Sequence, residues 1–122
     1  MKKLFIFVAL SLFAITAFAG VVNLLSGAKT TGAGTGVNLN GAAANRWAQA
    51  SLIGASAVSA TVEIDGSNDN SNWVPIATLV LAASPAASAT AATNTVQSAE
   101  YMRGNIIAIS GVGESVNLST AQ

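Results

Sequence analysis

The stretch that decides the fold is ATVEIDGSNDNSNWVPIATLVL, residues 60–81. Its first half alternates apolar side chains with Thr, Glu and Asp, and this two-residue period is typical of a strand that buries one side. The polar run 66–72 favours a turn, because Gly, Asn, Asp and Ser tolerate left-handed backbone angles or hydrogen-bond their own backbone. Trp73 restarts the apolar pattern, and residues 76–81 indicate a second, more fully buried strand. We therefore predict a long β-hairpin anchored by Trp73.

Further strand signals flank this hairpin. Residues 46–53, RWAQASLI, have strand-like length, and residues 101–110, YMRGNIIAIS, form a clear apolar run. The two glycines of 111–114 predict a tight turn, after which 115–120 alternate again with Val116 and Leu118 directed inward, so the chain is expected to end in a second hairpin.

The segments between these strands are predicted to be irregular. Residues 82–94 are rich in Ala but interrupted by Ser, Thr and Pro85, with no amphipathic stripe, and are interpreted as a surface loop followed by a short strand at 95–98. Residues 20–45 are rich in Gly, Thr and Asn and are interpreted as a flexible entry segment, with a short edge strand at 36–39.

The predicted fold class is all-β: a small antiparallel β-sandwich, jelly-roll-like, preceded by an N-terminal hydrophobic helical segment. The predicted organisation is a hydrophobic segment at 1–19, the entry segment at 20–45 and the sandwich domain at 46–122. Its length of 122 residues fits one domain with a modest core.

The amino-acid composition limits the catalytic and binding chemistry that the chain can perform. The chain has no Cys and no His, which excludes disulfides, zinc sites of the usual type and His-based acid–base catalysis. Charged residues make up only 8% of the sequence and balance to a net charge of zero, so no nucleic-acid partner is indicated. A surface with few charges resists self-association weakly, which suits a protein packed against copies of itself or a partner. We therefore predict a non-enzymatic protein.

The N-terminus has the pattern of a signal peptide. Lys2 and Lys3 precede an apolar run at 4–15, and Ala17 and Ala19 provide the small residues of a cleavage site before Gly20. The alternative is an uncleaved hydrophobic helix, since residues 4–25 are long enough to cross a bilayer. In that case these residues are the only expected membrane contact.

The candidate functional residues gather in the hairpin loop. The predicted contact set, for a glycan or a neighbouring subunit, is Asp65, Ser67, Asn68, Asp69, Asn70, Asn72, Trp73 and Trp47. No catalytic or metal site is predicted, although the Asp and Asn oxygens also suit calcium. An Asx-rich turn explains the same residues without a metal. Trp47 is expected in the core or at an interface, and Arg103 is expected to pair with Glu100 or Glu63 at the rim.

Two motifs carry a resemblance over residues 58–120. The first comprises Gly66, Ser67, Asn68, Asp69, Asn72 and Trp73, and the second comprises Tyr101, Arg103, Asn105, Ser110, Gly111 and Gly113. In this order they resemble a group of small bacteriophage structural proteins, in which a glycine usually stands at the position of Asn70. The resemblance implies a virion component of head or tail, such as a capsid decoration protein, that forms homo-oligomers and binds other virion proteins.

Two functions therefore remain as expectations. The first is a structural virion protein that acts through protein–protein contacts and is located in the particle. The second is an exported bacterial adhesive or glycan-binding module, or a surface-fibre subunit, secreted or displayed at the cell surface after cleavage of residues 1–19.

Overall fold

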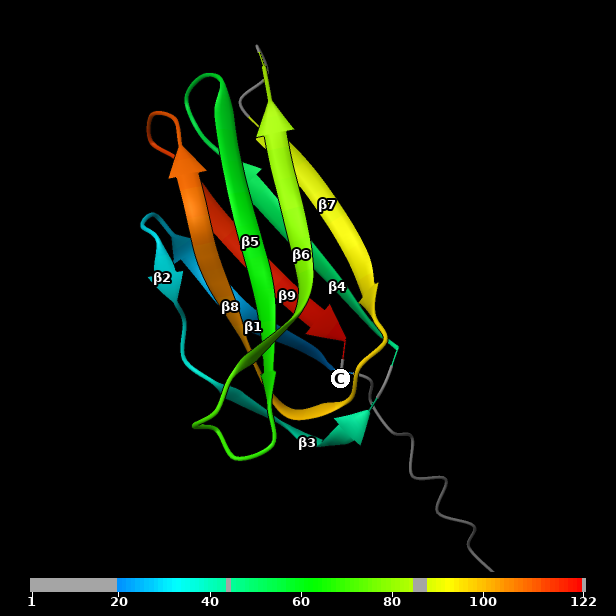
Figure 1. The fold of residues 1–122 in the computed structure, drawn as a ribbon. Coiled ribbons are helices and arrows are strands. Elements are labelled where there is room, and N and C mark those ends of the chain that lie inside the picture. Colours follow the sequence, from blue (N-terminus) through cyan, green and yellow to red (C-terminus); the bar gives the residue numbers. More distant parts are fainter. Residues whose placement is uncertain (1–19, 44, 85–87, 122) are drawn as a thin grey trace, which may run out of the picture.

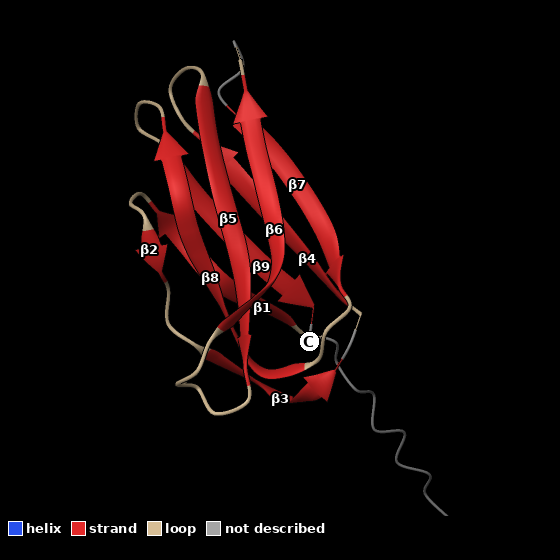
Figure 2. Ribbon diagram, viewed as in Figure 1, coloured by secondary structure: helices blue, strands red, loops and turns tan. Residues whose placement is uncertain are grey.

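The computed structural model describes residues 20–43, 45–84 and 88–121, which are built from strands and turns with no helix (Figure 2). The chain forms two antiparallel sheets that face one another (Figure 1). In chain order the strands are β1 (Val21–Ala28), β2 (Gly32–Ala33), β3 (Val37–Ala43), β4 (Arg46–Ile53), β5 (Val58–Ser67), β6 (Val74–Ala83), β7 (Ser88–Thr95), β8 (Ala99–Ser110) and β9 (Ser115–Ala121). This confirms the all-β antiparallel prediction, whereas the hydrophobic segment 1–19 lies outside the described residues.

Each sheet has a distinct strand order. The first, here called the terminal sheet because it contains the first and last strands, has the order β1-β9-β4-β7. The second, here called the hairpin sheet, has the order β2-β8-β5-β6, with β3 also pairing with β8. The chain crosses between the two sheets repeatedly, and β5–β6 is the one pair of consecutive strands joined in a described ladder.

The core lies between the two sheets. Alternating positions on the strands of both sheets point inward, as the two-residue strand period requires. Its fully or almost fully buried large side chains are Leu24, Leu25, Leu39, Leu52, Val58, Val62, Ile64, Leu79, Leu81, Met102, Ile106, Val116 and Leu118. The inward direction of Val116 and Leu118, expected from the sequence, is confirmed.

The central hairpin is confirmed, with longer strands than predicted. β5 and β6 pair from Val58↔Ala83 to Gly66↔Val74, and a bulge between Ile64 and Asp65 shifts the register near the loop. β6 is not the more fully buried strand that was expected, because it alternates buried Leu79 and Leu81 with exposed neighbours. It lies at the edge of its sheet, where one side faces solvent.

The segment 20–45 differs from its predicted role as a flexible entry. Residues 21–28 form β1 and pair with β9, while residues 37–43 form β3 and pair with β8. Leu24, Leu25 and Leu39 enter the core, so the sandwich begins at Val21 and not at residue 46. Register shifts in both strands interrupt the two-residue period, which hid them in the sequence.

Three further predictions are wrong. Residues 88–94, expected within a surface loop, belong to strand β7 (Ser88–Thr95), which pairs with β4 along its whole length. The last two strands do not form a hairpin: β8 lies in the hairpin sheet and β9 in the terminal sheet, so the turn at 111–114 bridges the layers. Residues 96–98 connect β7 to β8 and are not the short strand that was expected.

Candidate functional site

The loop between β5 and β6 is organised around Asp69. Its Oδ1 atom accepts hydrogen bonds from the Ser67 hydroxyl at 2.9 Å and from the backbone N–H groups of Ser71 at 2.9 Å and Asn72 at 2.8 Å. Its Oδ2 atom accepts one from the Asn72 side-chain amide at 2.6 Å. Asn70, at the tip, has a φ of 57°, in the left-handed region that favours Gly and that Asn tolerates.

These donors determine the charge state of Asp69. Hydrogen bonds from the backbone and side chain of Asn72, then from Ser71 and Ser67, hold the pKa of this carboxyl well below its ordinary value. A carboxylate with a lowered pKa is a weak base and stays ionised at neutral pH. Asp69 is therefore suited to holding the loop in one conformation.

A second unit links this loop to the hairpin sheet. The Arg103 Nε atom donates to Asp65 Oδ2 at 2.9 Å, and the guanidinium lies over the Trp73 ring, 4.4 Å from its centroid. Asp65 is 3% exposed, so Arg103 provides the charge that its burial requires. The sequence placed Arg103 in a salt bridge but named Glu100 or Glu63 as its partner, and the structure corrects the partner to Asp65.

The stacked unit also contacts the connection between β2 and β3. A side chain at Gly36 would meet the Trp73 ring at 2.7 Å and the Asn70 amide oxygen. Because Arg103 points away from the core, the loop folds back over the outer face of the hairpin sheet, and Trp73 is held between Arg103 and Gly36. Trp73 thus anchors the loop, as predicted, by stacking.

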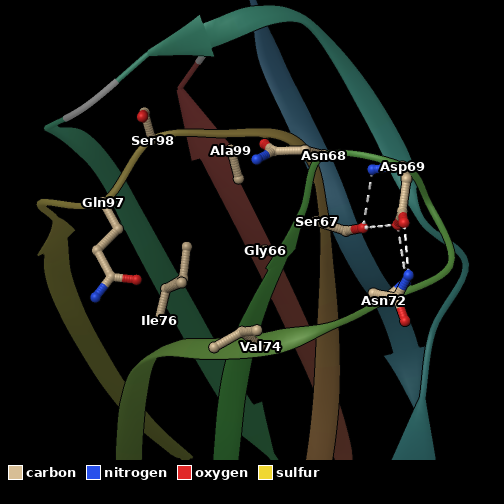
Figure 3. A pocket seen from close by; sticks show the side chains of 10 residues that line it. All are labelled: Gly66, Ser67, Asn68, Asp69, Asn72, Val74, Ile76, Gln97, Ser98 and Ala99. Carbon is tan, nitrogen blue, oxygen red and sulfur yellow. Dashed lines mark hydrogen bonds between the residues drawn. The ribbon is translucent and has the colours of Figure 1, made fainter.

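A shallow hollow of about 410 Å³ lies beside the loop (Figure 3). The β5–β6 segment contributes Ser67, Asn68 and the apolar Val74 and Ile76, and the link before β8 with the first residue of that strand contributes 97–99. The Asp69 hydrogen bonds close one side of the hollow in Figure 3. Amide, hydroxyl and apolar groups of this kind suit contact with an uncharged peptide or sugar surface.

The structure brings together most of the predicted contact residues. Asp65 and Ser67 are buried at the end of β5, whereas the loop residues Asn68, Asp69, Asn70 and Asn72 are exposed and Trp73 is half-buried. Trp47 is not part of this site and not in the core: it projects, 57% exposed, from the outer face of the terminal sheet.

The residues that complete the site were not predicted from the sequence. Gly36 and residues 97–99 are distant in sequence from the loop and carry no chemical motif. In the structure, Ser67 pairs with Tyr101 and Asp65 pairs with Arg103. The presence of both motifs in one sequence could therefore have indicated that they lie side by side. The two motifs, about 30 residues apart in the sequence, belong to adjacent strands.

The geometry does not favour calcium at the predicted oxygens. Asp65 faces the Arg103 guanidinium, and both carboxylate oxygens of Asp69 already accept hydrogen bonds. Within the described residues there is no cluster of three or more His, Cys, Asp or Glu side chains arranged to hold a metal ion. The same part of the chain contains no helix able to span a membrane.

The described part of the chain forms two facing antiparallel sheets, with a polar loop at one end that is held by hydrogen bonds among its own residues. No protein-family model matches the sequence, and neither the curated proteins nor the solved structures include a significant match.

Proposed function

We propose that this chain is a non-enzymatic structural protein of a bacteriophage virion, a decoration or head–tail accessory protein that acts by binding copies of itself and other virion proteins. The observation that carries the proposal is the order of the strands within each of the two sheets. We count β2 and β3 as one interrupted strand and renumber the strands from one to eight in chain order. The strand orders of the terminal sheet and the hairpin sheet are then 1-8-3-6 and 2-7-4-5. This is the connectivity of a jelly roll, a fold used by viral capsid proteins and by lectins.

The motif residues support the same reading. Their positions are explained by folding: Asp69 organises the loop, Arg103 stacks on Trp73, and Gly111 and Gly113 have φ values of 143° and 63° in the turn between the sheets. Residues with such folding roles are the ones that proteins of one architecture would be expected to share, and in this way the motifs support the proposal.

The surface chemistry also favours assembly. Charged residues form 8% of the chain, compared with about 25% in ordinary soluble domains. Low charge reduces the repulsion between copies held at high local concentration, as in a particle.

Mass spectrometry of particles purified from the native source tests the proposal. We expect peptides from the described domain at a copy number comparable to that of other structural proteins, and their absence from the particles would overturn it. The intact mass measured in the same sample reports whether residues 1–19 are removed.

The second candidate is an exported adhesive or glycan-binding module, favoured by the signal-peptide pattern of residues 1–19 and by exposed Trp47. Two results would favour this alternative. The processed chain would be found outside particles and would bind to a glycan array, and the Trp47→Ala substitution would abolish that binding. The Asn68→Ala variant tests the loop hollow in the same assay.

A further inference from the structure

The outer face of the terminal sheet is an uncharged surface. Strand β4 presents Trp47, Gln49, Ser51 and Ile53 outward, alternating with its buried positions. The neighbouring outward positions of β1, β9 and β7 carry Ser, Thr, Asn, Ala and one Val. Of the charged residues in the described ranges, none occupies an outward position on these four strands, since Arg46 points inward and is buried.

The two faces of the sandwich differ in this respect. The outer face of the hairpin sheet carries Glu63 and the unit of Asp65, Arg103 and Trp73. A two-fold interface sets a surface against its own copy, so that a charge near the axis meets the same charge. The outer face of the terminal sheet meets its own copy without that repulsion.

Two apolar anchors stand at the ends of β4 on this face. Trp47 is 57% exposed and Ile53 is 53% exposed, and they lie six positions apart along the strand, a distance of roughly 20 Å. With the two-fold axis in the interface plane and across the strands, the partner's β4 runs antiparallel. Each Trp47 then packs on Ile53 of the other copy, while Gln49 and Ser51 lie near the axis.

The size of the face fits a reversible contact. Four strands about 4.8 Å apart and about eight residues long cover roughly 20 by 25 Å, on the order of 500 Å² per copy. The pair would bury roughly 1,000 Å², the lower limit for a specific interface. Such a dimer is weak in solution and gains strength when many copies are held on one particle.

We propose that the outer face of the terminal sheet is a self-association surface, which binds a second copy of this chain across a two-fold axis near Gln49. This inference rests on the proposed function as an assembly protein and assigns the surface that joins its copies.

Sedimentation equilibrium of the full chain, over about a hundredfold range of concentration, tests it with Gln49→Lys. The added charge would meet itself at the axis, and we expect dimerisation to weaken by roughly tenfold or more. The matched control is Val80→Lys, which adds the same charge on the outer face of the hairpin sheet at a side chain 69% exposed. Thermal melting of each variant monitors the fold.

A dimer that Gln49→Lys weakens and Val80→Lys leaves unchanged supports the proposal. A wild-type chain that stays monomeric, a Gln49→Lys variant that dimerises normally, or a loss caused by Val80→Lys would each overturn it. A monomer still found in purified particles overturns this inference alone. A dimer absent from the particles overturns the proposed function and leaves the surface intact.

Discussion

Asp69 is a carboxylate that shapes its own loop. Replacing it with Ala removes the acceptor of the Ser71 and Asn72 N–H groups, and we expect both amides to exchange hydrogen faster with solvent. Hydrogen exchange followed by NMR measures this. The control is Asn68→Ala, which changes an exposed neighbour in the same loop. Equal exchange in Asp69→Ala and wild type would contradict the role given to Asp69.

The lowered pKa of Asp69 sets the pH range of this effect. Because the folded pKa lies below the ordinary value of about 4, the contribution of the ionised group is complete above that value and is lost as pH falls toward the folded pKa. We expect the amide shifts of Ser71 and Asn72 to stay constant down to about pH 4 and to change only in stronger acid. A transition at neutral pH would contradict this assignment.

Arg103 is expected to be the most sensitive polar position of the candidate site. Arg103→Met leaves Asp65 buried without its cation and removes the stack on Trp73, at an expected cost of roughly 2–3 kcal/mol. Denaturant unfolding measures this loss. In the double variant with Asp65→Asn, the total should be smaller than the sum of the single losses, because the uncompensated charge is gone. Additive losses would show that the pair does not act as a unit.

At the scale of the strands, Gly104 allows the two sheets to approach. A side chain on this residue of β8 would lie 2.5 Å from Leu25 of β1 and 2.8 Å from Leu118 of β9. We expect Gly104→Ala to lower the free energy of unfolding by about 1–3 kcal/mol through overpacking. Asn105→Ala, whose side chain points to the other face, is the control. If Gly104→Ala left the free energy of unfolding unchanged, the space between the two sheets at this residue would be large enough for a methyl group, and the packing argument would be wrong.

The strands also show which sequence signals suffice for prediction. The β5 pattern is visible because most of its inward residues, Val58, Val62 and Ile64, are β-branched, and its loop is visible because Gly, Asn, Asp and Ser cluster there. β7 was missed because its inward positions, Ala89 and Ala91 among them, are nearly as small as its outward ones. The contrast that reveals a half-buried strand is then absent.

Pairing between strands was harder to predict than the strands themselves. The two-glycine turn at 111–114 is compatible with a hairpin and with a bridge between layers, and local sequence does not distinguish them. For the candidate site, the loop residues were predictable because their chemistry is local. The partner of Arg103 was not, because the register of β5 against β8 determines it.

At the scale of the whole molecule, residues 20–45 are part of the folding unit. Removing them deletes β1 and β3 and takes Leu24, Leu25 and Leu39 from the core, at about 1.5–3 kcal/mol each. That sum is comparable to the total stability of a small domain. We expect a fragment of residues 46–122 to be unfolded by circular dichroism and NMR, while residues 20–122 fold. A folded short fragment would restore the boundary at residue 46.

The pairing of β1 with β9 has a consequence for the timing of folding. A chain emerging from the ribosome can form the β5–β6 hairpin early, because its strands are neighbours in sequence. The edge of β9 that receives β1 does not exist until the last residues have been synthesised. The first strand therefore stays without its partner strand, and accessible to the machinery that acts on nascent polypeptides, through almost the whole of translation.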